Sequence, residues 1–134
     1  DLFVIRVAGN VVSKAGVIVK GSIEYAVAEL GVPLILVLGH SQCGAVKAAL
    51  QHLDAKDALP CAIAGLVDAI KPAVIASKGK PGNPLDNAIE ANVLAGVARL
   101  KGLPPIVAPA VKQGRVKVVG GVYDLKSGAV TMIG

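Results

Sequence analysis

The stretch PLILVLGHSQCGAV, residues 33–46, decides the fold that this sequence predicts. It opens with an apolar run that does not alternate with polar residues, a pattern typical of parallel strands buried on both faces of a sheet. Glycines flank His40 and Cys43 where the run ends, and Ser41 is placed to cap a helix that carries Cys43. The stretch therefore predicts a buried strand, a tight turn and a helix in direct succession.

Segments typical of strands and helices alternate along the rest of the chain. The expected strands are residues 3–7, 34–38, 116–123 and 129–133, and the last two form a hairpin around DLKSG. Helices are expected after Ser22, after Ser41, after Pro60, from Asn87 to Leu100 and at residues 106–112. This alternation indicates an α/β domain with a central, largely parallel sheet flanked by helices and closed by a C-terminal β-hairpin.

Four side chains set the expected helix boundaries. Ser22 is placed to cap the first helix, and Asn87 and Glu90 have the spacing of a capping box for the fourth. Pro72 lies within the apolar region after Pro60, so the helix there should kink or split. The expected buried stripes are Ile23, Ala26, Val27 and Leu30 in the first helix, and Ile89, Val93, Val97 and Leu100 in the fourth.

Size and composition fit a single domain, residues 1–134, with a core of its own. Hydrophobic residues make up 54% of the chain and aromatic residues only 2%, so the core must consist of Val, Ile, Leu and Ala. Charged residues make up 17%, below the usual quarter, which indicates apolar surface buried against a partner. No apolar run is long enough to span a bilayer, so we expect a cytoplasmic protein without a membrane partner.

The net charge of +5 comes from 14 basic and 9 acidic residues that are scattered along the chain. Nucleic-acid-binding proteins cluster their Lys and Arg on one face or interleave them with aromatic residues. Neither pattern is present in this sequence, so we expect no nucleic-acid partner.

His40 and Cys43 are the residues best placed for chemistry. Cys43 falls in the first turn of the expected helix, where backbone N–H groups favour a negative sulfur, and His40 approaches from the strand end. Both are zinc-ligand types, but catalytic zinc normally takes three protein ligands. Taken alone, such a pair is more often a buried cysteine and a loop histidine without chemistry. His52 should face away from Cys43 on the helix, whereas Cys61, which could also pair with Cys43 in a disulfide, stays open as a ligand.

Several separated segments resemble elements of the β-class carbonic anhydrases. GHSQCGAV resembles the His-Ser-x-Cys-Gly element of that family, and DLFVIRVAGNVV resembles its strand and Arg-x-Ala-Gly-Asn turn. GSIEYAVAELGV resembles the helix that follows, and GRVKVVGGVYDLKSGAV resembles the terminal hairpin. Asn92 falls in a helix that resembles the penultimate helix of the family. The resemblance covers essentially the whole chain, with its motifs in the family's order.

The resemblance implies zinc-dependent interconversion of carbon dioxide and bicarbonate. Zinc would be held by His40, by Cys43 and by a cysteine of the family's Cys-x-Asp-x-Arg motif, whose Asp and Arg form a dyad beside the metal. The family carries this motif on a strand shortly before the segment that residues 1–10 resemble. We therefore expect the first zinc ligand and the dyad upstream of Asp1, and no catalytic residue of the dyad within the chain. The chain is expected to be N-terminally incomplete and, alone, inactive or impaired.

The resemblance also implies where the substrate binds and how the protein assembles. The family's cleft forms between subunits, which implies a homodimer or a higher even homo-oligomer. The residues that match the cleft are Phe3, Gly9, Asn10, Tyr25 and Gly44.

Two alternatives stay open beside this hypothesis. The chain could be a catalytically silent oligomerising module that keeps the fold of the family without its site. It could also belong to a hydrolase that acts on a linear substrate similar to carbon dioxide, such as carbon disulfide, on the same fold.

Overall fold

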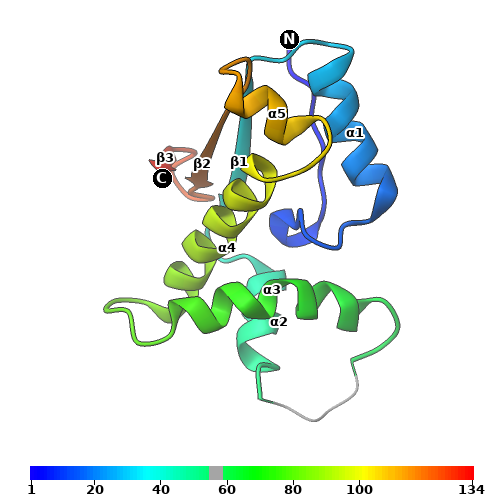
Figure 1. Ribbon diagram of the computed structural model, residues 1–134. Coiled ribbons are helices and arrows are strands. Elements are labelled where there is room, and N and C mark those ends of the chain that lie inside the picture. The colour runs from blue at the N-terminus through cyan, green and yellow to red at the C-terminus, as the bar shows by residue number, and fades with distance from the viewer. Residues whose placement is uncertain (55–58) are drawn as a thin grey trace.

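A computed structural model describes residues 1–54 and 59–134 of the chain (Figure 1). Its elements are η1 (Ala8–Asn10), α1 (Gly16–Ala28), β1 (Leu34–His40), α2 (Gly44–Gln51), α3 (Ile63–Ser77), α4 (Pro84–Lys101), α5 (Val107–Lys112), β2 (Lys117–Tyr123) and β3 (Val130–Ile133). The three strands form one sheet in the order β1-β2-β3. β1 and β2 are parallel, and β3 returns antiparallel to β2, so the expected α/β fold with a C-terminal hairpin is confirmed.

Strand pairing and a hydrogen-bonded turn hold the sheet in register. β1 and β2 pair from Leu34 opposite Lys117 to His40 opposite Tyr123, so both strands end at the same edge. The turn before β3 is closed by the Asp124 carboxylate, which accepts hydrogen bonds from the N–H groups of Lys126 and Ser127 and from the Ser127 hydroxyl. These bonds, the one from the Ser127 N–H above all, lower the pKa of Asp124.

Helix α4 packs closely on the sheet because glycines face it. A Cβ atom on Gly39 of β1 would lie 2.6 Å from Cγ2 of Val93, and one on Gly120 of β2 would lie 2.8 Å from its Cγ1. Gly96 extends the contact one turn later, where a Cβ would come within 3.1 Å of Val37. The fully buried Val93 thus fills the space that two missing side chains leave on neighbouring strands.

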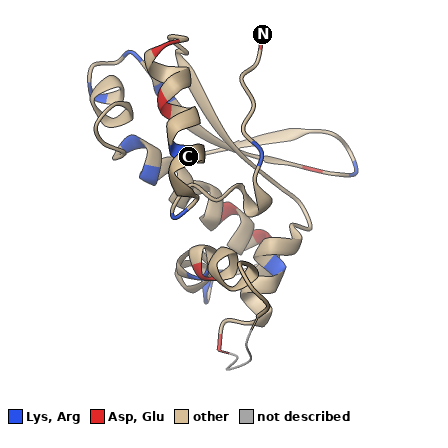
Figure 2. Ribbon diagram, turned by 90° about the vertical axis from the view of Figure 1, so that its right-hand side faces the viewer, with Lys and Arg blue, Asp and Glu red and all other residues tan. Residues whose placement is uncertain are grey.

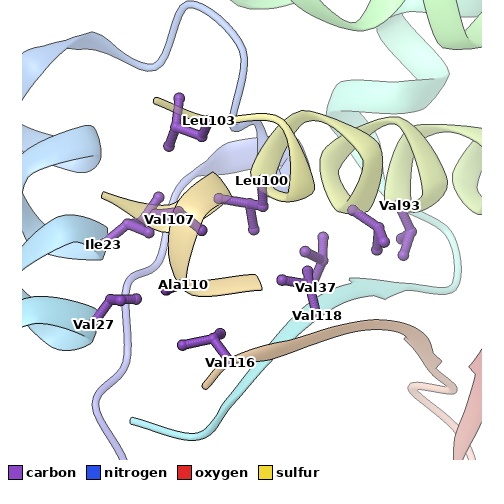
Figure 3. Close-up of a cluster of buried hydrophobic side chains, with 11 residues drawn as sticks. Ile23, Val27, Val37, Val93, Leu100, Leu103, Val107, Ala110, Val116 and Val118 are labelled. Atoms are coloured by element: carbon purple, nitrogen blue, oxygen red, sulfur yellow. The ribbon is translucent and has the colours of Figure 1, made fainter. Parts of the chain in front are cut away.

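Two apolar clusters make up the core. The first lies between the sheet, α4, α5 and α1 (Figure 3), and its buried members are Ile23, Val27, Val37, Val93, Val97, Leu100, Leu103, Val107, Ala110, Val116 and Val118. The second joins α2, α3 and α4, and its buried members are Val11, Cys43, Val46, Ala49, Val67, Ile70, Val74, Ala88 and Ile89. The expected α4 stripe is therefore confirmed, and neither cluster contains an aromatic side chain.

Charged residues contribute little to this packing. Lys and Arg lie on several helices and loops, with Asp and Glu among them (Figure 2). Ion pairs join Lys20 to Glu24 at 3.5 Å and Lys71 to Asp68 at 3.0 Å, with partly or largely exposed side chains. Exposed pairs of this kind stabilise a fold by less than about 1 kcal/mol, so apolar burial holds the domain together. No helix within the described ranges has the length and hydropathy needed to cross a membrane.

The prediction that β1 is buried on both faces is wrong for this chain. Val37 is buried under α4, but the side chains of Leu34, Leu36 and Leu38, on the opposite face, are exposed. The reason is visible in Figure 1, where α4 and α5 cover one face of the sheet. The same open face carries Met132 of β3, so an apolar sheet surface faces outward.

The predicted strand at residues 3–7 is also absent. These residues are not assigned to a helix or strand, and most of their apolar side chains are exposed. A strand requires a neighbour for its backbone hydrogen bonds, and residues 3–7 pair with no strand in the described parts of the chain. The turn expected after them is confirmed as η1.

The starts of three helices, α1, α2 and α4, differ from the prediction. α1 begins at Gly16, so Ser22 lies inside it and its hydroxyl donates to the Ile18 carbonyl at 2.8 Å. Leu30 lies beyond the end of α1 and is half exposed, unlike the rest of the predicted stripe. α2 begins at Gly44, and the Ser41 hydroxyl instead accepts a hydrogen bond from the Leu125 N–H.

α4 and α3 also differ from the prediction, α4 in its capping residue and α3 in its continuity. Asn83, not Asn87, caps α4: its Oδ1 accepts hydrogen bonds from the N–H groups of Leu85 and Asp86. The side chain of Asn87 donates backwards to two loop carbonyls. α3 runs from Ile63 to Ser77 through Pro72, so the predicted split is wrong. Pro72 lies on the exposed face of α3, where water can satisfy the carbonyl that loses its helical partner.

The Gly39→Ala substitution should destabilise the fold by about 1–3 kcal/mol, because the new methyl group overlaps Val93. Urea unfolding measures the loss, and a double-mutant cycle with Val93→Ala should show that the two effects are less than additive. Gly65→Ala in α3 is the matched control, since its Cβ would meet nothing within 4 Å, and it should leave stability equal or higher. Equal losses in both alanine variants would contradict close packing at Gly39.

The Asn83→Ala substitution should cost about 1 kcal/mol of stability, because it removes the cap of α4. Thermal unfolding followed by circular dichroism measures this cost. Glu90→Ala, which removes the other half of the capping box that the sequence predicts, should change stability by less than about 0.5 kcal/mol, since Glu90 is exposed. If Glu90→Ala lowered stability more than Asn83→Ala, the result would support the capping box that the sequence predicts.

Candidate metal centre

His40 is the last residue of β1, and a backbone carbonyl holds its ring. Nδ1 lies 2.9 Å from the carbonyl oxygen of Ser41. A carbonyl oxygen can only accept, so Nδ1 carries the proton and donates it. In a neutral imidazole this arrangement leaves the lone pair on Nε2, the atom that could then bind a metal.

The loop between His40 and Cys43 is tied to the β2–β3 hairpin. The Ser41 N–H donates to the Tyr123 carbonyl at 2.9 Å, and the Leu125 N–H donates to the Ser41 hydroxyl at 2.9 Å. Gln42 adopts a φ of 56°, a left-handed conformation that few residues other than glycine adopt and that turns the chain sharply. These contacts fix the path of the chain between the imidazole and the thiol.

Cys43 is the N-cap residue of α2 and is nearly enclosed. Only 3% of its surface is exposed, and it packs in the second apolar cluster with Val11, Val46 and Ile89. Cys61 is exposed, and both thiols are free, so the two cysteines do not form the disulfide that the sequence left open. His52 lies at the opposite end of α2 from Cys43, as its C-cap residue.

The η1 turn packs beside the start of α2 and the end of β1. The Gly9 carbonyl accepts a buried hydrogen bond from Nδ2 of Asn92 at 2.7 Å. A Cβ atom on Gly9, whose φ is 63°, would lie 2.7 Å from Cδ1 of Ile70 and 3.1 Å from Cβ of Ala45, so a larger residue would be strained there. Asn10 follows, with its Oδ1 3.4 Å from the position of a Cβ on Gly39. Asn10 thus lies next to the residue that precedes His40, and Gly44 begins α2 directly after Cys43.

Asn92 is a residue to which the sequence reasoning assigned no role. It is 7% exposed, and its carboxamide holds η1 in place across 83 residues of chain. The signal was present in the sequence: Asn92 is a polar residue next to Val93 on the apolar stripe of a helix. A polar side chain in such a position must find a buried partner.

Phe3 and Tyr25 contact each other. Their ring centroids are 6.4 Å apart, with the planes tilted by 34°. Both rings are about half exposed, Phe3 on the extended N-terminal segment and Tyr25 on the outer side of α1. In the described parts of the chain, no hydrogen bond or ring contact connects either ring to His40 or Cys43.

His40 and Cys43 carry side chains of the types that bind zinc, and a catalytic zinc site normally takes three protein ligands. In residues 1–54 and 59–134, no group of three or more His, Cys, Asp or Glu side chains is arranged to hold a metal. A neutral imidazole with a free Nε2 and a cysteine thiol are both donor types that zinc takes. His40 and Cys43 are thus suitable for zinc in donor type, and the described ranges place no third candidate ligand in a group with them.

The carboxylate of Asp1 does not fill this gap. Asp1 is exposed at the start of the extended N-terminal segment, and it belongs to no group of metal-binding side chains in the described ranges. The cysteine ligand and the Asp/Arg dyad that the sequence analysis expects upstream of Asp1 lie outside the described residues. Their presence there stays a prediction.

Comparison with known proteins connects these features to a family. A family model described as carbonic anhydrase matches residues 1–130. The carbonic anhydrase of Mycolicibacterium smegmatis is 37% identical over 132 residues, which are 98% of this chain and 63% of the relative. The carbonic anhydrase of Pseudomonas aeruginosa is 40% identical over 136 residues, which cover 97% of this chain and 61% of the relative. The chain thus spans less than two thirds of the length of these relatives.

Solved structures agree with the sequence matches. The structure of the β-carbonic anhydrase CcaA superimposes with a TM-score of 0.82 at 27% identity, covering 98% of this chain and 67% of that one. A Coccomyxa β-carbonic anhydrase in complex with acetazolamide gives 0.81 at 30% identity, covering 98% of this chain and 60% of that one. The resemblance noted in the sequence is confirmed: the chain belongs to the β-carbonic anhydrase family.

Proposed function

We propose that the complete protein interconverts carbon dioxide and bicarbonate at a zinc ion held by His40, Cys43 and a third protein donor outside these 134 residues. The observation that carries the proposal is the hydrogen bond from Nδ1 of His40 to the Ser41 carbonyl. It leaves the lone pair of Nε2 available to a metal, three residues before the Cys43 thiol, in a chain that belongs to the carbonic anhydrase family.

The third donor is a cysteine of a Cys-x-Asp-x-Arg segment upstream of Asp1, by resemblance to the family. Two features of the structure support a further strand at this place. β1 pairs only with β2 in the described ranges, so its other edge is free, and residues 3–7 are extended without a strand partner. A strand parallel to β1 on its free edge would end beside His40, because the carboxyl ends of parallel strands meet at one edge of the sheet.

Several residues of this chain would have a defined task in such a site. Zinc, when bound, would lower the pKa of its water to about 7 and so supply hydroxide near neutral pH. Ser41 orients His40 through its carbonyl and anchors the loop to the hairpin through its hydroxyl. Gly9 lets η1 lie close to the start of α2, and the exposed rings of Phe3 and Tyr25 offer a surface suited to carbon dioxide.

A homo-oligomer with an even number of subunits is part of the proposal. The open sheet face carries Leu36 and Leu38, which converge with Val130 on the position of a Cβ on Gly121. All three are exposed by more than 40%, and contiguous apolar surface of this kind marks interaction sites. This chain is similar to a β-carbonic anhydrase of Sordaria macrospora, with a TM-score of 0.78 at 25% identity over 95% of this chain and 65% of that chain. The two β-carbonic anhydrases of that fungus are described as tetrameric.

The enclosure of Cys43 favours a second candidate function. A thiol that is 3% exposed in an apolar cluster fits an oligomerising module that keeps the fold without a metal. The cysteine substitutions below distinguish the two functions.

Cys43→Ser in the complete protein should abolish stoichiometric zinc and lower carbon dioxide hydration by more than about a hundredfold, because it removes a ligand. Elemental analysis and stopped-flow hydration assays measure both effects. Cys61→Ser is the matched control, since Cys61 is exposed and lies outside the site, and it should change neither. Full zinc content in Cys43→Ser would contradict the role of Cys43 as a ligand, and a wild-type protein without zinc would favour the silent module.

Leu36→Glu should raise the protein concentration at which the oligomer half-dissociates by about tenfold or more, because a charge would be buried against the partner. Analytical ultracentrifugation measures this shift. Ile75→Glu is the matched control on α3, where the side chain is 58% exposed, and should not alter assembly. If Leu36→Glu lowers only the stability of an unchanged oligomer, the open face is covered within one chain and not by a second copy.

A further inference from the structure

Three polar groups of Ser41 are hydrogen-bonded, and two of their partners belong to the C-terminal hairpin. The Ser41 N–H donates to the Tyr123 carbonyl at 2.9 Å, and the Ser41 hydroxyl accepts from the Leu125 N–H at 2.9 Å. The third group, the Ser41 carbonyl, lies 2.9 Å from Nδ1 of His40. The residue that holds the His40 ring is therefore itself held by the end of β2 and by the turn that follows it.

The turn after β2 is arranged around the carboxylate of Asp124. Its Oδ1 accepts hydrogen bonds from the Lys126 N–H at 3.0 Å, from the Ser127 N–H at 2.7 Å and from the Ser127 hydroxyl at 2.9 Å. Contacts of this kind are typical of Asp in turns, where the side chain organises the peptide groups that follow it. The Leu125 N–H, the first in the turn, is not bound by the carboxylate and donates to Ser41 instead.

The carboxylate organises the tip of the hairpin, because the backbone alone closes its base. The Asp124 N–H donates to the Ala129 carbonyl at 2.8 Å, and the Gly128 N–H donates to the Asp124 carbonyl at 2.9 Å. β2 and β3 pair beyond these bonds, from Tyr123 opposite Val130 onward. Loss of the carboxylate should therefore leave the two strands paired and loosen the tip, which includes the peptide group that contacts Ser41.

We propose that Asp124 is a positioning residue for the metal centre: by ordering the turn after β2, it directs the Leu125 N–H to Ser41, whose carbonyl holds Nδ1 of His40. This inference rests on the proposed function, because only a metal gives the free Nε2 of His40 a task. Asp124 touches neither metal nor substrate in this assignment. Partners of a metal-binding histidine fix its tautomer and its ring orientation, and here the partner is fixed in turn by a carboxylate.

The experiment compares two substitutions of Asp124 in the complete protein. Asp124→Ala removes the acceptor of the turn, whereas Asp124→Asn keeps an oxygen that can take its place. Asn83→Ala is the matched control, because the Asn83 side chain likewise accepts from two backbone N–H groups, at the amino end of α4. It tests whether a general loss of stability produces the same effects.

Three measurements follow the proposed chain of contacts from the turn to the metal. Amide hydrogen exchange at Leu125 reports the bond to Ser41. The ¹⁵N chemical shifts of the His40 ring in the metal-free protein report its tautomer. Chelator competition gives the zinc affinity, and the absorption of the cobalt-substituted protein reports the ligand geometry.

We expect Asp124→Ala to speed exchange at Leu125 by about five- to tenfold, because one hydrogen bond is weakened. The His40 ring should become a mixture of tautomers, and zinc binding should weaken by about tenfold with an altered cobalt spectrum. Asp124→Asn should stay close to the wild type in all three measurements. Asn83→Ala should lower the unfolding temperature and change none of them.

Unchanged ring signals and zinc affinity in Asp124→Ala would overturn the role of Asp124 and leave the proposed function intact. Equal changes in Asn83→Ala would also overturn it, because they would trace the effect to stability and not to the turn. A wild-type protein that binds no zinc would overturn both the proposed function and the role of Asp124 at a metal centre.

Discussion

The close packing of α4 on the sheet is the constraint on which the rest of this structure depends. Val93 enters the space that Gly39 and Gly120 leave open on two neighbouring strands, and any larger residue there would force the helix away from the sheet. Asn92 is the preceding residue on α4, and its carboxamide reaches the Gly9 carbonyl only at this depth. The glycines of the sheet therefore determine where η1 lies, and with it the side chain of Asn10.

The same edge of the sheet gathers residues from three distant parts of the chain. β1 delivers His40, the hairpin after β2 holds Ser41 through Tyr123 and Leu125, and η1 contributes Gly9 and Asn10. Each contact is a hydrogen bond to the backbone or a close approach at a glycine, so the geometry depends little on flexible side chains. A loop fixed in this way is suited to present an imidazole and a thiol at a constant separation.

The fold could be predicted from the sequence where the pattern depends on burial, and not where it depends on neighbours. The apolar run of β1, the hairpin and the stripe from Ile89 to Leu100 each follow from hydrophobic periodicity, and each is present. Ser22, Ser41 and Asn87 have the side chains of helix caps, but a cap forms only where the helix begins, and each of these helices begins at another residue. The Ser41 hydroxyl instead accepts a hydrogen bond from Leu125, which is 84 residues away.

The site could be predicted only as far as local sequence reaches. His40 and Cys43 stand three residues apart, so their chemistry was visible, whereas Asn92 and its contact with Gly9 depend on tertiary packing. The free edge of β1 and its exposed leucines show a comparable limit, since an unalternating apolar run indicates a covered strand but does not say what covers it.

The proposed third zinc donor and a strand partner for the free edge of β1 are both needed at the same strand. One parallel strand would supply both, because its backbone would pair with β1 and its carboxyl end would lie beside His40.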